Sequence, residues 1–99
     1  MSEAPRPPAP VQLPEDETVL LTLPPYAVIL HNDDHNSMDH VVQSLLVCVP
    51  ELEAEQAVQV MLTAHEEGRA RVIRCPLERA ELYRDRLEAQ GLTATIEKT

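Results

Sequence analysis

Between residues 26 and 97, apolar residues recur at spacings that are typical of strands in some segments and of helices in others. The first segment, Tyr26 to His31, is apolar without interruption from Val28 to Leu30, which predicts a central strand buried on both faces. Asn36 or Ser37 can cap the following helix, and Pro50 ends it. The apolar positions of that helix have three- and four-residue spacing: Met38, Val41, Val42, Leu45, Leu46 and Val49.

The remaining segments predict two further helices and two further strands. Their expected bounds are a helix from about Leu52 to Glu66, a strand from Arg69 to Cys75, a helix from Glu78 to Gln90 and a strand from Leu92 to Glu97. Gly68 suits the end of the second helix, because glycine readily adopts the left-handed conformation found there.

The resulting order is β-α-α-β-α-β. A helical hairpin lets the first two strands run antiparallel, and one crossover helix makes the second and third strands parallel to each other. Both conditions hold if the first strand lies between the other two. We therefore predict an α+β two-layer sandwich, with helices on one face of a three-stranded antiparallel sheet.

Proline divides the chain into two parts, because seven of its nine prolines lie within residues 1–25. Proline removes backbone donors and favours extended conformations, so residues 1–25 are predicted to be a Pro-rich flexible N-terminal extension. Within it, Val19 to Leu23 is apolar enough to dock on the domain or pair with a sheet edge. Residues 26–99 are predicted to form the folded domain.

The net charge of −9 argues against a nucleic acid or an anionic membrane surface as partner. Cys48 and Cys75 are too far apart for a zinc or redox motif, so buried free thiols are expected. No apolar run approaches the ~18 residues of a membrane span, and no signal peptide is recognised. We expect a cytoplasmic protein without a cofactor.

The turn after the first strand carries the candidate chemistry. Asn32 to His35 are four consecutive residues with acceptor side chains, and the second helix ends with His65. An ammonium group has donors and no acceptor, and charge-assisted hydrogen bonds to it are strong. Met38, Val41 and Met61 could form an adjacent apolar cavity. This arrangement favours capture of the free amino terminus of another polypeptide.

Each of these features also has a structural explanation. Asp33 and Asp34 could be turn or capping residues, Met38 and Met61 could belong to the core, and His65 could interact with the helix dipole.

Two other functions use the same residues. A small metal-binding protein could use the His31, Asp33 and His35 cluster, together with Asp34 and His40. A hydrolase could use Asp33, Asp34 and His65 as acid and base, although no nucleophile motif accompanies them.

Three motifs together resemble one known family. They are Tyr26-x-Val28-Ile29-Leu30-x-Asn32-Asp33-Asp34, Met38-x-x-Val41-Val42 and Met61-Leu62-x-x-His65-x-x-Gly68-Arg69-Ala70. The chain is similar over about residues 26 to 97 to ClpS, a family of adaptors of the ATP-dependent Clp protease. The resemblance implies the same β-α-α-β-α-β sandwich. It also implies binding of substrates with a bulky apolar N-terminal residue (Leu, Phe, Tyr or Trp) and their delivery to a Clp unfoldase.

The resemblance also implies roles for individual residues. The substrate N-terminus would be bound by Asn32, Asp33, Asp34, Asn36 and His65. The hydrophobic pocket would be formed by Met38, Val41, Met61, Ala64 and Ile96. Glu78 would contact the N-terminal domain of the Clp AAA+ unfoldase.

The chain departs from the common family pattern at several positions. Asn36-Ser37 replaces a Thr-Pro pair, His31 replaces an apolar residue, and Ala64 replaces a frequent Val. Tyr83 stands where many members have a Lys that touches the unfoldase. The third helix is shorter than in the common bacterial form and resembles the branch of cyanobacteria and plastids. These departures put the substrate preference and the affinity for the unfoldase in question.

Overall fold

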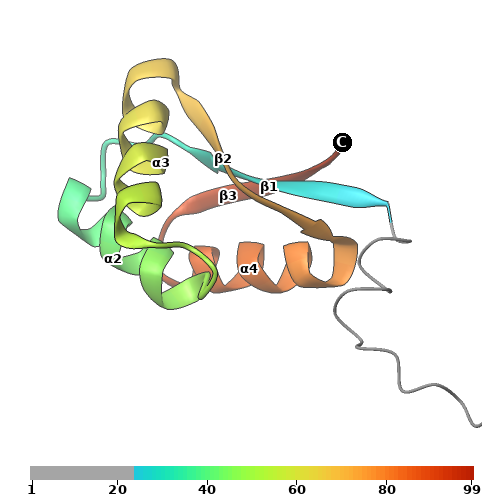
Figure 1. The fold of residues 1–99 in the computed structure, drawn as a ribbon. Helices are drawn as coiled ribbons and strands as arrows, with labels where there is room; N and C mark the ends of the chain where they lie inside the picture. Colours follow the sequence, from blue (N-terminus) through green and yellow to red (C-terminus); the bar gives the residue numbers. More distant parts are fainter. Residues whose placement is uncertain (1–23) are drawn as a thin grey trace, which may run out of the picture.

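The computed structural model describes residues 24–99, which form three strands and three helices in the predicted order. Their bounds are β1 Pro25–His31, α2 Met38–Cys48, α3 Ala54–Glu67, β2 Arg69–Pro76, α4 Leu77–Ala89 and β3 Thr93–Lys98. The antiparallel sheet has the order β2-β1-β3, and the helices lie on one of its faces (Figure 1). The predicted two-layer α+β sandwich is confirmed.

The central strand β1 is buried on both faces, as its uninterrupted apolar run predicted. Residues 27–30 are each at most 4% exposed. Val28 packs into the core beneath the helices, whereas Ile29 belongs to the opposite face. Ile29 is nevertheless buried, because it lies between its cross-strand partners Arg71 on β2 and Thr95 on β3. On this face, β1 is flanked by the two edge strands and has no second layer of helices among residues 24–99.

Two local contacts bring the end of β1 beside the end of α3. Gly68 ends α3 in the left-handed conformation, with φ 92°. Its carbonyl accepts a hydrogen bond of 2.9 Å from the backbone N–H of Asn32. Ser37 caps α2 by accepting the backbone N–H of His40 at 3.1 Å. The turn at residues 32–36 is therefore held between two helices.

Element boundaries differ from the predicted ones by one or two residues. The helix α3 begins at Ala54, because Glu53 and Gln56 form a reciprocal capping box in front of it. The strand β3 begins at Thr93, because the backbone N–H of Leu92 still donates to the carbonyl of Leu87 at the end of α4.

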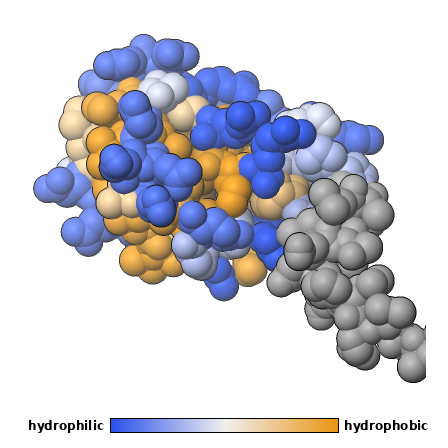
Figure 2. Space-filling view, in the orientation of Figure 1, coloured by the Kyte–Doolittle hydropathy of each residue, from blue (hydrophilic) through white to orange (hydrophobic). Residues whose placement is uncertain are grey.

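The core contains both thiols as buried free cysteines, as expected. Burial raises the pKa of Cys48 and of Cys75. Figure 2 shows apolar side chains gathered at the end of the molecule where α2 and α3 lie, and Met38, Val47 and Val58 are exposed on those helices.

Within residues 24–99, every helix is too short or too polar to span a bilayer. The predicted docking segment Val19 to Leu23 lies outside the described residues, as does most of the predicted extension 1–25.

Candidate functional site

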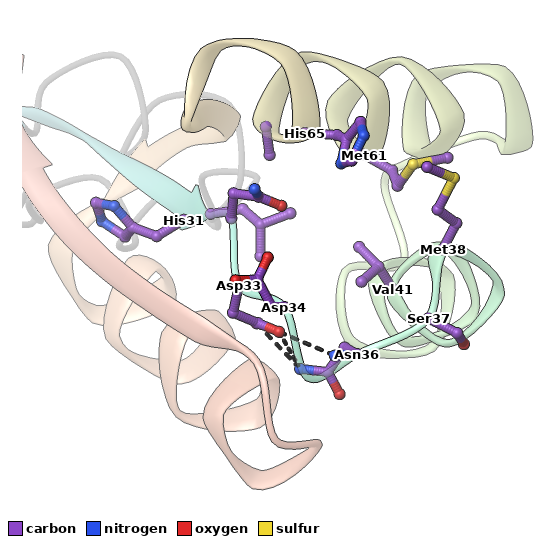
Figure 3. A pocket seen from close by; sticks show the side chains of 12 residues that line it. His31, Asp33, Asp34, Asn36, Ser37, Met38, Val41, Met61 and His65 are labelled. Atoms are coloured by element: carbon purple, nitrogen blue, oxygen red, sulfur yellow. Dashed lines mark hydrogen bonds between the residues drawn. The ribbon is translucent and has the colours of Figure 1, made fainter.

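A cavity of about 300 Å³ opens between the turn after β1, the start of α2 and the last turns of α3. Figure 3 shows its walls, with side chains entering from these three segments. The lining comprises Leu30, His31, Asn32, Asp33, Asp34, Asn36, Ser37, Met38, Val41, Met61, Ala64 and His65.

The polar end of the cavity has three side chains whose hydrogen-bonding capacity is unused. Asn32, Asp34 and His65 are exposed and line the cavity. None of their side chains bonds to another of residues 24–99. An amide oxygen, a carboxylate and an imidazole nitrogen are therefore available to a ligand that donates hydrogen bonds.

Asp33 differs from its neighbour Asp34, because its carboxylate is occupied by the turn itself. Its Oδ1 accepts the backbone N–H groups of His35 at 2.8 Å and of Asn36 at 2.9 Å. Both carboxylate oxygens also accept the Asn36 side-chain amide, at 3.1 and 3.0 Å (Figure 3). Burial opposes ionisation, but these hydrogen bonds, aided by nearby His35, bring the pKa of Asp33 below its ordinary value.

The other end of the cavity is apolar. Met38 from α2 and Met61 from α3 point toward one another in Figure 3, and Val41 and Ala64 lie on the same helices. Leu30 also lines the cavity, although its place in the apolar run predicted only a core position. Its position two residues before Asn32 was the signal, because a residue at the end of a central strand can line what lies beyond it.

Two residues singled out in the sequence lie differently from the others. Ile96 does not line the cavity, because it pairs with Val28 in the middle of the sheet and packs against the core. His31 also borders the cavity, but its ring is bonded outside it. It points away toward β3 in Figure 3, where its Nε2 is 2.8 Å from Thr95 Oγ1.

The alternative metal site is not assembled. Among residues 24–99, no three His, Cys, Asp or Glu side chains come together as a metal-binding group. His31 bonds to Thr95 on the sheet, and Asp33 is occupied by Asn36 and the turn. His40 instead bonds through Nε2 to the carbonyl of Gln90 at 2.8 Å.

The helix α4 carries two residues that the resemblance had singled out. Glu78 is exposed in its first turn, so it is available at the surface. Tyr83 is 5% exposed, and its hydroxyl donates to Glu51 at 2.5 Å. Tyr83 therefore packs into the domain. It is not exposed as a residue that touches a partner protein would have to be.

The chain is thus a small α+β domain whose cavity has acceptor side chains at one end and apolar side chains at the other. The sequence profile described as "ATP-dependent Clp protease adaptor protein ClpS" matches residues 22–95 of this chain. The chain therefore belongs to the ClpS family of protease adaptors.

Individual relatives agree with this assignment. The chain is 45% identical over 87 residues to the ATP-dependent Clp protease adapter protein ClpS of Synechococcus elongatus, covering 88% of this chain and 92% of that protein. It is 46% identical over 74 residues to chloroplastic CLPS1 of Chlamydomonas reinhardtii, covering 75% of this chain and 46% of that protein. A solved structure of Agrobacterium tumefaciens ClpS2 bound to L-phenylalaninamide is similar with a TM-score of 0.72 and 28% identity, covering 77% and 98% of the two chains.

Proposed function

We propose that this protein is an adaptor that binds the free N-terminal residue of substrate proteins and delivers them to an ATP-dependent Clp unfoldase for degradation. The first residue would be bulky and apolar: Leu, Phe, Tyr or Trp. The protein would have no catalytic activity of its own. The observation that carries the proposal is the pairing of unused acceptors with an apolar cavity.

The acceptors suit an α-ammonium group, which carries three N–H donors on one nitrogen. Asp34 supplies the negative charge, and the Asn32 amide oxygen and a neutral His65 imidazole supply further lone pairs. Asp33 would act mainly by shaping the turn, since its oxygens are already bonded to Asn36 and the backbone.

The apolar end suits the first side chain of the substrate. Met38 and Met61 have flexible thioether side chains that adjust to different apolar shapes, which suits several large residues rather than one. The related Agrobacterium protein was solved with L-phenylalaninamide, which presents a free amine beside an aromatic side chain. That ligand has the two chemical features that this cavity would recognise.

Delivery requires a second surface. We assign it to the α4 side of the domain formed by residues 26–99, with exposed Glu78 contacting the N-terminal domain of the unfoldase. The location is proposed to be cytoplasmic. The chloroplastic description of the Chlamydomonas relative makes an organelle the alternative to test.

The deciding experiment compares two labelled peptides that begin with Phe and differ only in N-terminal acetylation. Acetylation removes the positive charge and two N–H donors. Each charged hydrogen bond contributes about 1.5–3 kcal/mol, so the loss in affinity should be tenfold or more. Equal affinity of the two peptides in a fluorescence anisotropy titration would contradict the proposal.

His65→Ala tests the assignment of the acceptors with the same peptides. The variant should bind the peptide with a free N-terminus about tenfold more weakly. Its weak affinity for the acetylated peptide should be the same as that of the wild type. Glu78→Ala is the matched surface variant: it should bind both peptides like the wild type but slow the degradation of a Phe-starting substrate by the Clp protease.

A further inference from the structure

The side chain of Asn36 joins its own turn to a loop that is distant in the sequence. Its Nδ2 donates to both carboxylate oxygens of Asp33, at 3.1 and 3.0 Å. The same nitrogen donates to the carbonyl of Gly91, at 2.9 Å, in the loop between α4 and β3. The turn that lines the cavity is thereby tied to an element 55 positions further along the chain.

We propose that Asn36 is a positioning residue of the peptide site: it acts through Asp33, is held in place by its bond to the Gly91 loop, and does not itself contact the bound peptide. This inference rests on the proposed function. It replaces the direct contact to the substrate N-terminus that the family resemblance implies for Asn36.

The hydrogen-bonding capacity of the amide supports a positioning role. A primary amide has two N–H groups, and here they serve one carboxylate and one carbonyl. The amide oxygen faces the same loop, since a Cβ built on Gly91 would lie 3.8 Å from it. Figure 3 shows that oxygen pointing away from Asp33. Neither donor is left for a peptide backbone.

The effect of Asn36 on the site passes through Asp33. Asp33 lies between Asn32 and Asp34, and its carboxylate also accepts the backbone N–H groups of His35 and Asn36. These bonds fix the backbone of the turn. They thereby fix the directions in which the side chains of Asn32 and Asp34 point. The precise placement of residues that contact a ligand depends on such supporting hydrogen bonds.

A second tie to the same loop provides a control. His40 in the first turn of α2 bonds through Nε2 to the carbonyl of Gln90 at 2.8 Å. Because a carbonyl only accepts, Nε2 carries the proton in this bond. Loss of His40 would weaken the attachment to the loop without touching Asp33.

The test is a double-mutant cycle with Asn36→Ala, Asp33→Ala and the double variant. The ligands are three peptides that begin with Phe and have Ala, Ser or Lys as the second residue. Asn36→Ala should weaken binding about tenfold, by the same factor for all three peptides. In the Asp33→Ala background, removing Asn36 should change the affinity less than twofold. His40→Ala, compared at a temperature where it is as folded as Asn36→Ala, should retain most of the affinity.

Additive losses, or a loss whose size depends on the second residue, would show direct contact and overturn the proposal. An equal loss in His40→Ala would overturn it too, because general loosening of the fold would then explain the effect.

A readout without ligand separates this proposal from the proposed function. The carboxyl carbon of Asp33 should titrate by NMR at a higher pH in Asn36→Ala than in the wild type. His35 is present in both proteins, so its influence on Asp33 cancels in the comparison. A shift without peptide binding by the wild type would contradict the proposed function alone, whereas an unchanged titration would contradict the positioning role of Asn36.

Discussion

Two polar clusters of this small domain differ in what their side chains contact. At the base of the molecule, the Tyr83 hydroxyl donates to Glu51, and the Arg79 guanidinium lies 3.4 Å from the same carboxylate. At the cavity, the side chains of Asn32 and Asp34 have no such partner among residues 24–99. The first cluster stabilises the fold, whereas the second is open to a ligand. Acceptors without a partner beside an apolar cavity are the feature that distinguishes the proposed binding site from a polar cluster within the fold.

The same contrast separates two neighbouring acids. Asp33 accepts hydrogen bonds from the turn and from Asn36, and Asp34 accepts none from residues 24–99. Adjacent residues of identical chemistry are therefore expected to have different roles, and substitutions can separate them.

The largest effect is expected for Asp34→Asn, which keeps the size of the side chain and removes its charge. Affinity for a Phe-starting peptide should fall about tenfold or more, because a charged hydrogen bond is replaced by a neutral one. The midpoint of urea unfolding should stay nearly unchanged, since this side chain has no partner in the fold. Anisotropy and urea titrations measure the two quantities, and unchanged affinity would remove Asp34 from the site.

A smaller effect is expected for Met38→Ala at the apolar end. Met38 is 47% exposed, so only part of its apolar surface is available to cover a bound side chain. This truncation should lower the affinity for peptides that begin with Leu or Phe about fivefold, which corresponds to ~1 kcal/mol. Peptides that begin with Ile or Val should gain affinity relative to those that begin with Leu, because a smaller side chain at position 38 would widen the cavity. A panel of peptides with different first residues measures this, and an unchanged ranking would contradict a gating role.

Tyr83→Phe tests the partnered cluster. It should lower the free energy of unfolding by about 0.5–1 kcal/mol through loss of one hydrogen bond, and leave peptide affinity within twofold. Urea unfolding and peptide titration of the same preparation compare the two clusters directly. A large loss of affinity would mean that the clusters are coupled.

The pH dependence of the same variant has a defined sign. Burial, with the hydrogen bond to Glu51 and its charge, raises the pKa of Tyr83 to about 12. A raised folded pKa stabilises the protein below the unfolded pKa of ~10, and this contribution is lost as pH rises toward 12. The stability difference between wild type and Tyr83→Phe should therefore shrink from pH 9 to pH 11, and a constant difference would contradict the assignment.

The smallest effect is expected at acid pH for Asp33→Asn. The pKa of Asp33 is lowered in the folded protein, so ionised Asp33 stabilises the fold above its unfolded pKa of ~3.9. That contribution is lost as pH falls through the lower folded pKa. Between pH 5 and pH 2, the unfolding free energy of the wild type should fall more steeply than that of the variant. Parallel curves would show that the turn does not depend on this charge.

Much of the fold was predictable because its determinants are local. The three- and four-residue spacing from Met38 to Val49 and the uninterrupted run of β1 predicted elements within one or two residues of their observed ends. Placing β1 in the centre of the sheet followed from connection lengths. Asn32, His65 and the two methionines were candidate site residues from their positions at the ends of predicted elements, and the fold brings them to one cavity.

The sequence by itself determined which elements form and which chemistry is available at the turn from Asn32 to Asn36. The tertiary structure decided how that chemistry is distributed: Asp33 turns toward Asn36, Ile96 packs into the core, and the His31 side chain points toward Thr95. The physical reason is distance along the chain. Periodicity reports neighbours within a few residues, whereas the contact between Asn36 and Gly91 spans 55 positions and exists only once the sheet and helices have packed.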